Sequence, residues 1–140
     1  MNRYTFEECH IGLKECFETE ITKEKMEAFC HISGDINPLH IDADFAVAKG
    51  FDGIVSYGLL TASFFSTLVG VYLPGERCLI QEVSYKFMKP VYPGDRLKVT
   101  GEVVDIDERS KQLMLKVRIR RISDNALMIR GKMTVGVLED

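Results

Sequence analysis

The chain has 140 residues, of which 46% are hydrophobic and 28% are charged. This size and composition suit a single domain with a hydrophobic core, and we expect residues 1–140 to form one. The 18 basic and 21 acidic residues give a net charge of −3, which does not favour a nucleic-acid-binding protein. No apolar run approaches the roughly 20 residues that cross a bilayer, so no membrane partner is expected. Because the N-terminus has no apolar signal core, the expected location is cytoplasmic.

The cysteines show neither a Cys-x-x-Cys pair nor the spacing of zinc ligands. No basic cluster lies beside any of them to lower a thiol pKa, so a catalytic thiolate is not favoured. We expect buried free thiols at Cys9, Cys16, Cys30 and Cys78. His10 and His31 lie at no metal-ligand spacing from acidic residues, and no metal site is predicted.

The first predicted elements are a strand over residues 13–20 and a helix over residues 23–32. Thr22 suits the N-cap of this helix, and Gly34 suits a left-handed residue at its end. A loose apolar stripe indicates the side of the helix that is buried. It consists of Met26, Phe29, Cys30 and Ile32.

The most informative segment follows this helix and runs from Asp35 to His40. Pro38 lacks a backbone N–H and disfavours helical geometry at Asn37, so we expect a rigid turn that Asn37 supports through side-chain hydrogen bonds. A carboxylate and an imidazole at the two ends of such a turn can share one water molecule, which is an acid–base device. The plainer alternative is that Asp35 caps a backbone turn and His40 satisfies a buried carbonyl.

Two more helices are predicted downstream of the turn. Asp42 suits the N-cap of a short helix over residues 43–49, which ends at Gly50. Residues 57–70 predict the longest helix and include no charged side chain, which is typical of a helix inside a core. Small residues along it would let a sheet approach closely, namely Gly58, Ala62, Ser63, Ser66 and Gly70.

Four segments with period-two alternation follow and predict an antiparallel meander. Their apolar faces are Val83, Tyr85 and Phe87; Leu97, Val99, Gly101 and Val103; Leu113, Leu115, Val117 and Ile119; and Leu127, Ile129, Met133 and Val135. Residues 105–111 and 123–125 have the composition of hairpin turns. One buried helix beside an antiparallel sheet is an α+β pattern.

Basic side chains alternate along two of these predicted strands. They are Lys116, Arg118 and Arg120 on one strand, and Arg130 and Lys132 on the next. Such rows are usually a solvated sheet face, and the alternative is that some of them contact phosphate groups, for which arginine geometry is suited.

Three segments of the sequence resemble those of a known family. The segment from Phe29 to Asp42 resembles the signature of the MaoC-like dehydratases and R-specific enoyl-CoA hydratases, which have the hot-dog fold. Residues 53–64 resemble the family's aliphatic pair, His-Gly step and small-residue helix, and residues 83–95 resemble its strand and Pro-Gly-Asp turn. The likeness covers residues 13–138 and implies an antiparallel sheet wrapped around one long central helix.

The resemblance implies reversible hydration of a trans-2-enoyl thioester, or dehydration of an R-3-hydroxyacyl thioester, by a hydro-lyase. Asp35 and His40 match the catalytic pair, and Gly58 matches the oxyanion donor at the start of the central helix. Ser56 and Tyr57 lie beside Gly58 in positions that contact substrate. No cofactor is implied beyond the coenzyme A or acyl carrier protein that carries the substrate. The resemblance also implies a homodimer or a higher multiple, with the acyl pocket near the interface.

One position departs from the family pattern, because Tyr57 stands where the family has His. The substitution leaves open a changed substrate or a weakened activity. A hot-dog thioesterase and a non-catalytic acyl-thioester binding module therefore remain alternatives. We favour packing or pocket shaping for Tyr57, since an ordinary tyrosine pKa of about 10 makes it a poor base at neutral pH.

Overall fold

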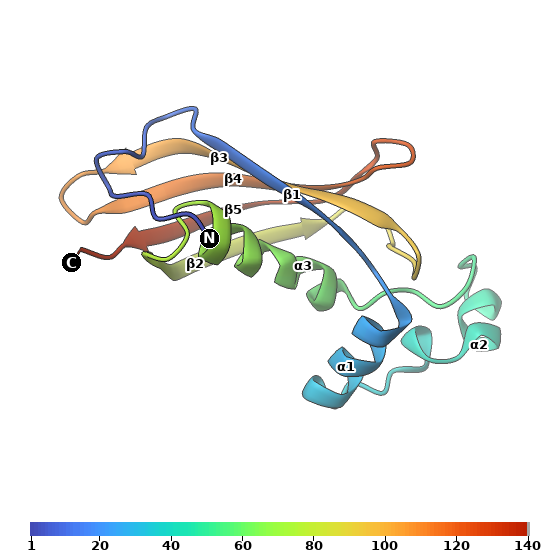
Figure 1. Cartoon of the computed structure of the whole chain (residues 1–140). Helices are drawn as coiled ribbons and strands as arrows, with labels where there is room; N and C mark the ends of the chain where they lie inside the picture. Colours follow the sequence, from blue (N-terminus) through green and yellow to red (C-terminus); the bar gives the residue numbers. More distant parts are fainter. Residues whose placement is uncertain (140) are drawn as a thin grey trace.

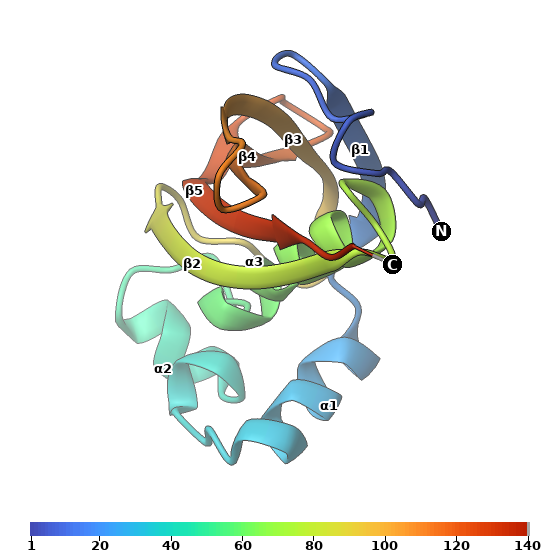
Figure 2. The same cartoon turned by 90° about the vertical axis from the view of Figure 1, so that its left-hand side faces the viewer.

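The computed structural model describes residues 1–139 and shows a sheet that curves around one helix (Figures 1 and 2). The strands are β1 (Lys14–Glu20), β2 (Cys78–Phe87), β3 (Arg96–Asp107), β4 (Gln112–Arg121) and β5 (Leu127–Val137). They pair in the order β1-β3-β4-β5-β2, and every neighbouring pair is antiparallel. The helices are α1 (Lys23–Ser33), α2 (Ala43–Ala48) and α3 (Gly58–Thr67), and α3 continues into a π-helical turn, Leu68–Tyr72. The α+β hot-dog fold predicted from the sequence is confirmed.

The core lies between α3 and the concave face of the sheet. Leu60, Ala62 and Phe65 of α3 are buried there, and the helix has no charged residue to keep in water. The sheet contributes fully buried side chains from β3 and β4, namely Leu97, Val99, Val103, Leu113, Leu115, Val117 and Ile119. Each such burial contributes roughly 1.5–3 kcal/mol, so this layer holds α3 in place. Among residues 1–139, no helix combines the length and the apolar character that a membrane crossing requires.

The close approach of helix and sheet depends on a glycine of β3. A Cβ added to Gly101 would lie 2.9 Å from Cδ2 of Leu68. Real Cβ contacts are longer than this, so a side chain at position 101 would force the Leu68 side chain at the end of the central helix to shift.

The meander forms as predicted, with one correction on β5. The register between β4 and β5 shifts where Ile119 pairs with Ile129 and Arg120 pairs with Leu127. The extra residue is Met128, which is fully buried although the alternation placed it on the outer face. A bulge breaks strict alternation, and it cannot be seen in the apolar pattern of one strand alone.

The capping predictions for the helices are confirmed. Thr22 Oγ1 accepts a hydrogen bond from Lys25 N at 3.2 Å, and Gly34 ends α1 with φ of 72°. Asp42 Oδ1 accepts from Phe45 N at 3.1 Å and so caps α2. The prediction that Ile32 belongs to the buried stripe is wrong, because this side chain is 83% exposed. The helix stands beyond the end of the sheet, where only part of its circumference meets the core (Figure 1).

The cysteines only partly match the prediction of buried thiols. Cys16 is exposed, because β1 turns alternate residues away from the core and its neighbour Phe17 instead stacks on Tyr72, with ring centroids 5.1 Å apart. Cys9 is buried, and burial raises the pKa of both Cys9 and Cys78 to about 11. Thiols with raised pKa values are poor nucleophiles at neutral pH.

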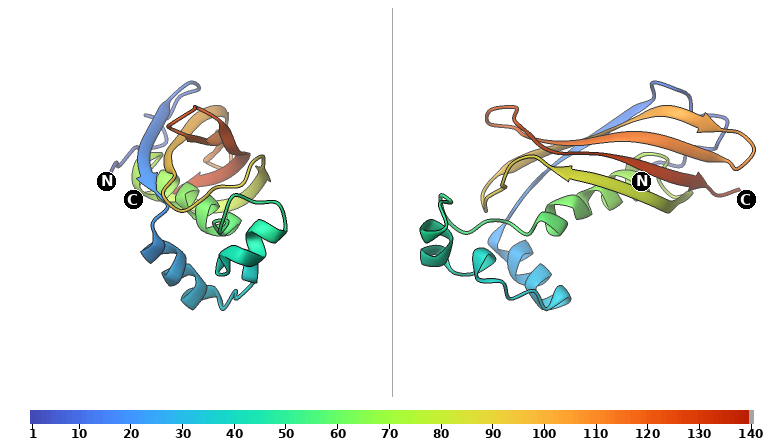
Figure 3. Two further views of the ribbon diagram at one scale, coloured as in Figure 1. Left: turned by 90° about the vertical axis from the view of Figure 1, so that its right-hand side faces the viewer. Right: turned by 180° about the vertical axis from the view of Figure 1, so that it is seen from behind.

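Strand β2 is an edge of the sheet and is unusually apolar for an edge (Figure 3, right). Its partly exposed apolar residues are Leu79, Ile80, Val83 and Phe87. Only β5 pairs with it among the described strands, so one side of its backbone is open. A long apolar edge of this kind is a place where another strand can pair.

The close packing between β5 and β2 at Gly131 leads to a prediction about the stability of the protein. A Cβ at Gly131 would overlap Ser84 O and lie 2.6 Å from Cδ1 of Tyr85, so Gly131→Ala must open the β5–β2 pairing. We expect a loss of about 1–3 kcal/mol in the free energy of unfolding, measured by urea denaturation. Gly53→Ala is the control, because nothing lies within 4 Å of the added Cβ. Equal midpoints for the two variants would contradict this account of the packing.

Candidate active site

The turn between α1 and α2 places Asp35 and His40 on one rigid segment. Pro38 begins a 3-10 helix, Pro38–His40, and Asn37 Oδ1 caps it by accepting from Leu39 N at 3.0 Å. Asp35 Oδ1 accepts from Asn37 N at 3.0 Å. These local bonds are those that Asx residues make in turns, and they fix the direction of the Asp35 side chain.

The imidazole of His40 is oriented by a main-chain carbonyl. His40 Nδ1 lies 2.7 Å from Val55 O. A carbonyl can only accept, so Nδ1 carries the proton and Nε2 is left with a lone pair in the neutral ring. His40 therefore presents Nε2 as an acceptor for water or substrate.

Tyr57 connects the two ends of the turn. Its hydroxyl donates to the main-chain oxygen of Asp35 at 2.8 Å. Its ring packs on His40, with centroids 4.2 Å apart, and on Phe29, with centroids 4.9 Å apart. Burial is the main cause that raises the pKa of Tyr57 to about 12, with Cys30 and Asp35 adding to it. The residue thus stays protonated and acts as a donor.

The start of α3 supplies backbone donors beside this pair. Tyr57 is the N-cap residue and gives no side-chain cap, so the first N–H groups of the helix, beginning with Gly58, point out of its end. Gly58 is exposed, and a Cβ there would lie 3.2 Å from Cε1 of Phe87. A helix start also carries partial positive charge, which favours a developing anion.

Two open hollows meet at these groups. A hollow of about 210 Å³ is lined by Asp35, His40, Tyr57, Gly58 and Phe87, with Phe29 and Leu59. A second hollow, of about 290 Å³, shares His40, Gly58 and Phe87 with the first. The predicted residues Asp35, His40 and Gly58 therefore face one space.

Ser56 lies beside this space but is tied into the protein. It is buried and lines the second hollow, and its hydroxyl lies 3.3 Å from Thr61 Oγ1 and 3.4 Å from Tyr57 O. Its backbone N–H donates to Val91 O at 2.7 Å. The structure thus gives Ser56 hydrogen bonds that hold the start of α3.

The plainer roles considered for Asp35 and His40 are both present, and neither uses up the residue. Asp35 uses Oδ1 to accept the hydrogen bond of the turn, and His40 uses Nδ1 to donate to Val55 O. Asp35 Oδ2 and His40 Nε2 have no hydrogen-bond partner within residues 1–139. The bonds that satisfy the fold therefore leave one polar atom of each side chain without a partner, and both side chains line the shared hollow.

The sequence reasoning missed one contact and left another question open. The Tyr57 hydroxyl bond to Asp35 has no signal in the sequence, because it joins residues that lie 22 positions apart. The basic rows on β4 and β5 lie on the face of the sheet turned away from α3, so the sheet separates them from Asp35 and His40. Within residues 1–139, no three His, Cys, Asp or Glu side chains gather as a metal site would require.

Comparison with known proteins now adds to this geometry. Residues 12–125 match the MaoC-like domain family. The chain belongs to the MaoC-like family. Among its MaoC-like relatives, the 3-hydroxybutyryl-CoA dehydratase of Methylorubrum extorquens is 34% identical over 72% of this chain, which spans only 64% of that relative. The (R)-specific enoyl-CoA hydratase of Aeromonas caviae is 33% identical over 89% of this chain and 92% of its own length.

Solved structures agree with the MaoC-like assignment. An (R)-hydratase from A. caviae superposes with a TM-score of 0.88 at 32% identity, covering 93% of this chain and 98% of the other. The turn, the start of α3 and the hollows between them all lie inside the matched residues. This MaoC-like protein is an enzyme of the hydro-lyase type.

The bond from Tyr57 to Asp35 can be tested by removing one oxygen atom. Tyr57→Phe keeps both ring contacts and loses only the donor to the Asp35 carbonyl, a neutral hydrogen bond worth about 0.5–1.5 kcal/mol. We expect a folded variant whose turnover falls by about tenfold at most. Steady-state kinetics beside a melting curve measures this. A larger loss with an unchanged melting temperature would mean that the hydroxyl itself takes part in the chemistry.

Proposed function

We propose that this enzyme adds water reversibly across the double bond of a trans-2-enoyl thioester and, in reverse, dehydrates an R-3-hydroxyacyl thioester. The observation that carries the proposal is the convergence of Asp35, His40 and the start of α3 on one open space. Relatives named as an (R)-specific enoyl-CoA hydratase and a 3-hydroxybutyryl-CoA dehydratase support it. Those names also support the R stereochemistry and a coenzyme A thioester.

In the hydration direction, one water molecule is held between Asp35 Oδ2 and His40 Nε2. As the water oxygen bonds to the β carbon, one of its protons passes to this pair. The pair returns a proton to the α carbon, so the enzyme ends unchanged. We assign Asp35 to activate the water and His40 to hold it and to move the second proton. The two residues thereby act together as one acid–base device.

The charge that develops during the reaction needs its own partner. Attack at the β carbon makes the thioester oxygen enolate-like, and we assign the N–H of Gly58 at the start of α3 to bind it. Donors of this type typically contribute about 10²–10³ in rate. The chemistry then needs no cofactor beyond the carrier of the substrate.

The proposal includes a second copy of the chain as a partner subunit. We propose a homodimer formed through β2, whose open backbone and apolar side chains suit pairing with the same strand of a partner. Phe87 at the end of β2 lines both hollows, so a partner on this edge lies next to the site.

The acid–base pair is tested by Asp35→Asn and His40→Gln. Each variant keeps the size of its side chain, so we expect normal folding and a fall in crotonyl-CoA hydration of at least about 10². The loss of enoyl absorbance without thiol release is the measurement. Thiol release would instead indicate a thioesterase, and neither change would indicate a binding module.

Matched controls for these variants are Asp52→Asn and His10→Gln, which alter exposed side chains outside both hollows. Both controls should hydrate crotonyl-CoA at the unmodified rate. Near-normal turnover of Asp35→Asn or His40→Gln, at equal folded protein, contradicts the assignment of that residue.

The dimer is tested by placing a charge on the open edge. Val83 lies in the middle of β2 with 46% of its surface exposed. Val83→Lys should shift sedimentation from dimer to monomer at micromolar concentration, because burying an unpaired ammonium is costly. Ile122→Lys is the control, since Ile122 is 40% exposed but lies beyond the end of β4. A Val83→Lys variant that stays dimeric would exclude this edge as the interface.

A further inference from the structure

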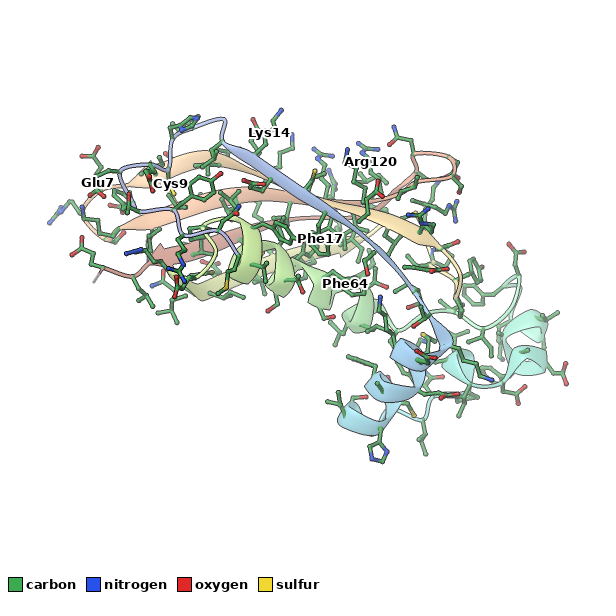
Figure 4. All side chains as sticks on the ribbon, viewed as in Figure 1. Glu7, Cys9, Lys14, Phe17, Phe64 and Arg120 are labelled. Carbon is green, nitrogen blue, oxygen red and sulfur yellow. The ribbon has the colours of Figure 1, made fainter. Side chains whose placement is uncertain are left out.

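The convex face of the sheet has a dense group of basic side chains. Figure 4 shows the same face at Lys14 and Arg120, whose side chains lie on the side turned away from α3. The group, here called the outer basic cluster, consists of Lys86 on β2, Lys116 and Arg118 on β4, and Arg130 and Lys132 on β5. It lies on a chain whose net charge is −3.

The pairing register places like charges directly opposite one another. Arg130 pairs across the strands with Arg118 on one side and with Lys86 on the other. Lys116 pairs with Lys132. Directly opposite side chains have Cβ atoms about 4.5–5.5 Å apart, and like charges at that spacing destabilise a sheet. An anion bound between them would remove the repulsion.

No acidic side chain of the described residues forms an ion pair with the cluster. Glu102, the cross-strand neighbour of Lys116, lies 3.9 Å from Lys14 instead. Glu82 and Asp105 line an adjoining hollow at the Lys132 end, so the positive charge is greatest around the two arginines.

The cluster also borders a groove of small-molecule size. The groove has a volume of about 590 Å³ and is lined by all five basic residues, with Ser84 and Val104 among the others. Ligand sites typically measure about 300–1,000 Å³. Arg118 and Arg130 stand on a rigid sheet, and paired guanidinium groups are suited to phosphate oxygens because each can donate two parallel hydrogen bonds.

We propose that this groove binds an organic phosphate with two or more phosphate groups, at a site separate from the thioester site. The sheet stands between them: Lys86 and Arg130 point outward, whereas their neighbours Phe87 and Ile129 line the catalytic hollow. One phosphate lies between Arg118 and Arg130, and a second reaches the Lys116–Lys132 pair.

The test uses ADP and pyrophosphate as probes, with isothermal calorimetry on the full chain at low ionic strength. We expect both probes to bind more tightly than inorganic phosphate, because they span two pairs of cations. The variant Arg118→Ala/Arg130→Ala should weaken binding by at least about tenfold, as expected for loss of charged hydrogen bonds. Since this variant removes a repulsive pair, its fold should be kept. Lys132→Ala is a second variant with a smaller expected loss.

Two controls separate this proposal from the proposed function. Arg109→Ala removes an exposed arginine in the turn between β3 and β4 and should bind ADP normally. His40→Gln should also bind ADP normally, whatever its hydration activity. Loss of ADP binding in His40→Gln would place the ligand in the catalytic hollow and overturn the proposal.

Three other results would also overturn it. One is the absence of binding heat at millimolar ADP. Another is equal weakening in Arg109→Ala and Arg118→Ala/Arg130→Ala, which would indicate general charge attraction. The last is binding of heparin that is much tighter than binding of ADP, with several protein molecules on each heparin chain. That result would assign the face to a long polyanion.

Discussion

The short segment Val55–Tyr57 connects the turn from Asp35 to His40 to the rest of the molecule. Val55 N donates to Leu39 O at 3.1 Å, and Val55 O accepts a hydrogen bond from His40 Nδ1. Ser56 N donates to Val91 O, and the Tyr57 hydroxyl donates to Asp35 O. The turn has few other contacts with the sheet, since α1 and α2 stand beyond its end (Figure 3, right). The position of Asp35 and His40 relative to the start of α3 therefore depends on these hydrogen bonds and on the packing of the Tyr57 ring against His40 and Phe29.

The packing of α3 against the sheet determines where the segment Val55–Tyr57 ends and the helix begins. The helix carries no charged residue and packs its buried side against the curved sheet, while Leu59, Ser63 and Ser66 stay exposed. Its first residue lies where the sheet stops covering it. At that point the backbone N–H groups are free and water can enter. A helix packed against the sheet with an open N-terminus thus combines structural stability along its length with unpaired backbone donors beside the hollows.

The two faces of the sheet have opposite characters, because side chains alternate along each strand. On β4 the inward residues are fully buried, whereas Lys116 is exposed and Arg118 and Arg120 are partly exposed. The inward alternation explains the stability of the fold. The outward-facing basic residues do not stabilise the fold, since the pairing of the strands sets like charges side by side. We therefore propose a bound anionic ligand as the reason for their arrangement.

The sequence by itself determined the elements and most of their caps. Period-two alternation fixed the strands, the uncharged run fixed the central helix, and Thr22, Gly34 and Asp42 marked helix ends, because all of these signals are local. The motif from Asp35 to His40 also named the pair that the structure places on one hollow.

Tertiary structure decided what local signals cannot contain. The bulge that buries Met128 depends on the register with β4, and the exposure of Ile32 and Cys16 depends on which faces the rest of the chain covers. The bond from Tyr57 to Asp35 and the stacking of like charges across β4, β5 and β2 likewise join residues that are distant in sequence. Such contacts follow from how strands pair and helices pack, and those are long-range choices that the periodicity of a single segment leaves open.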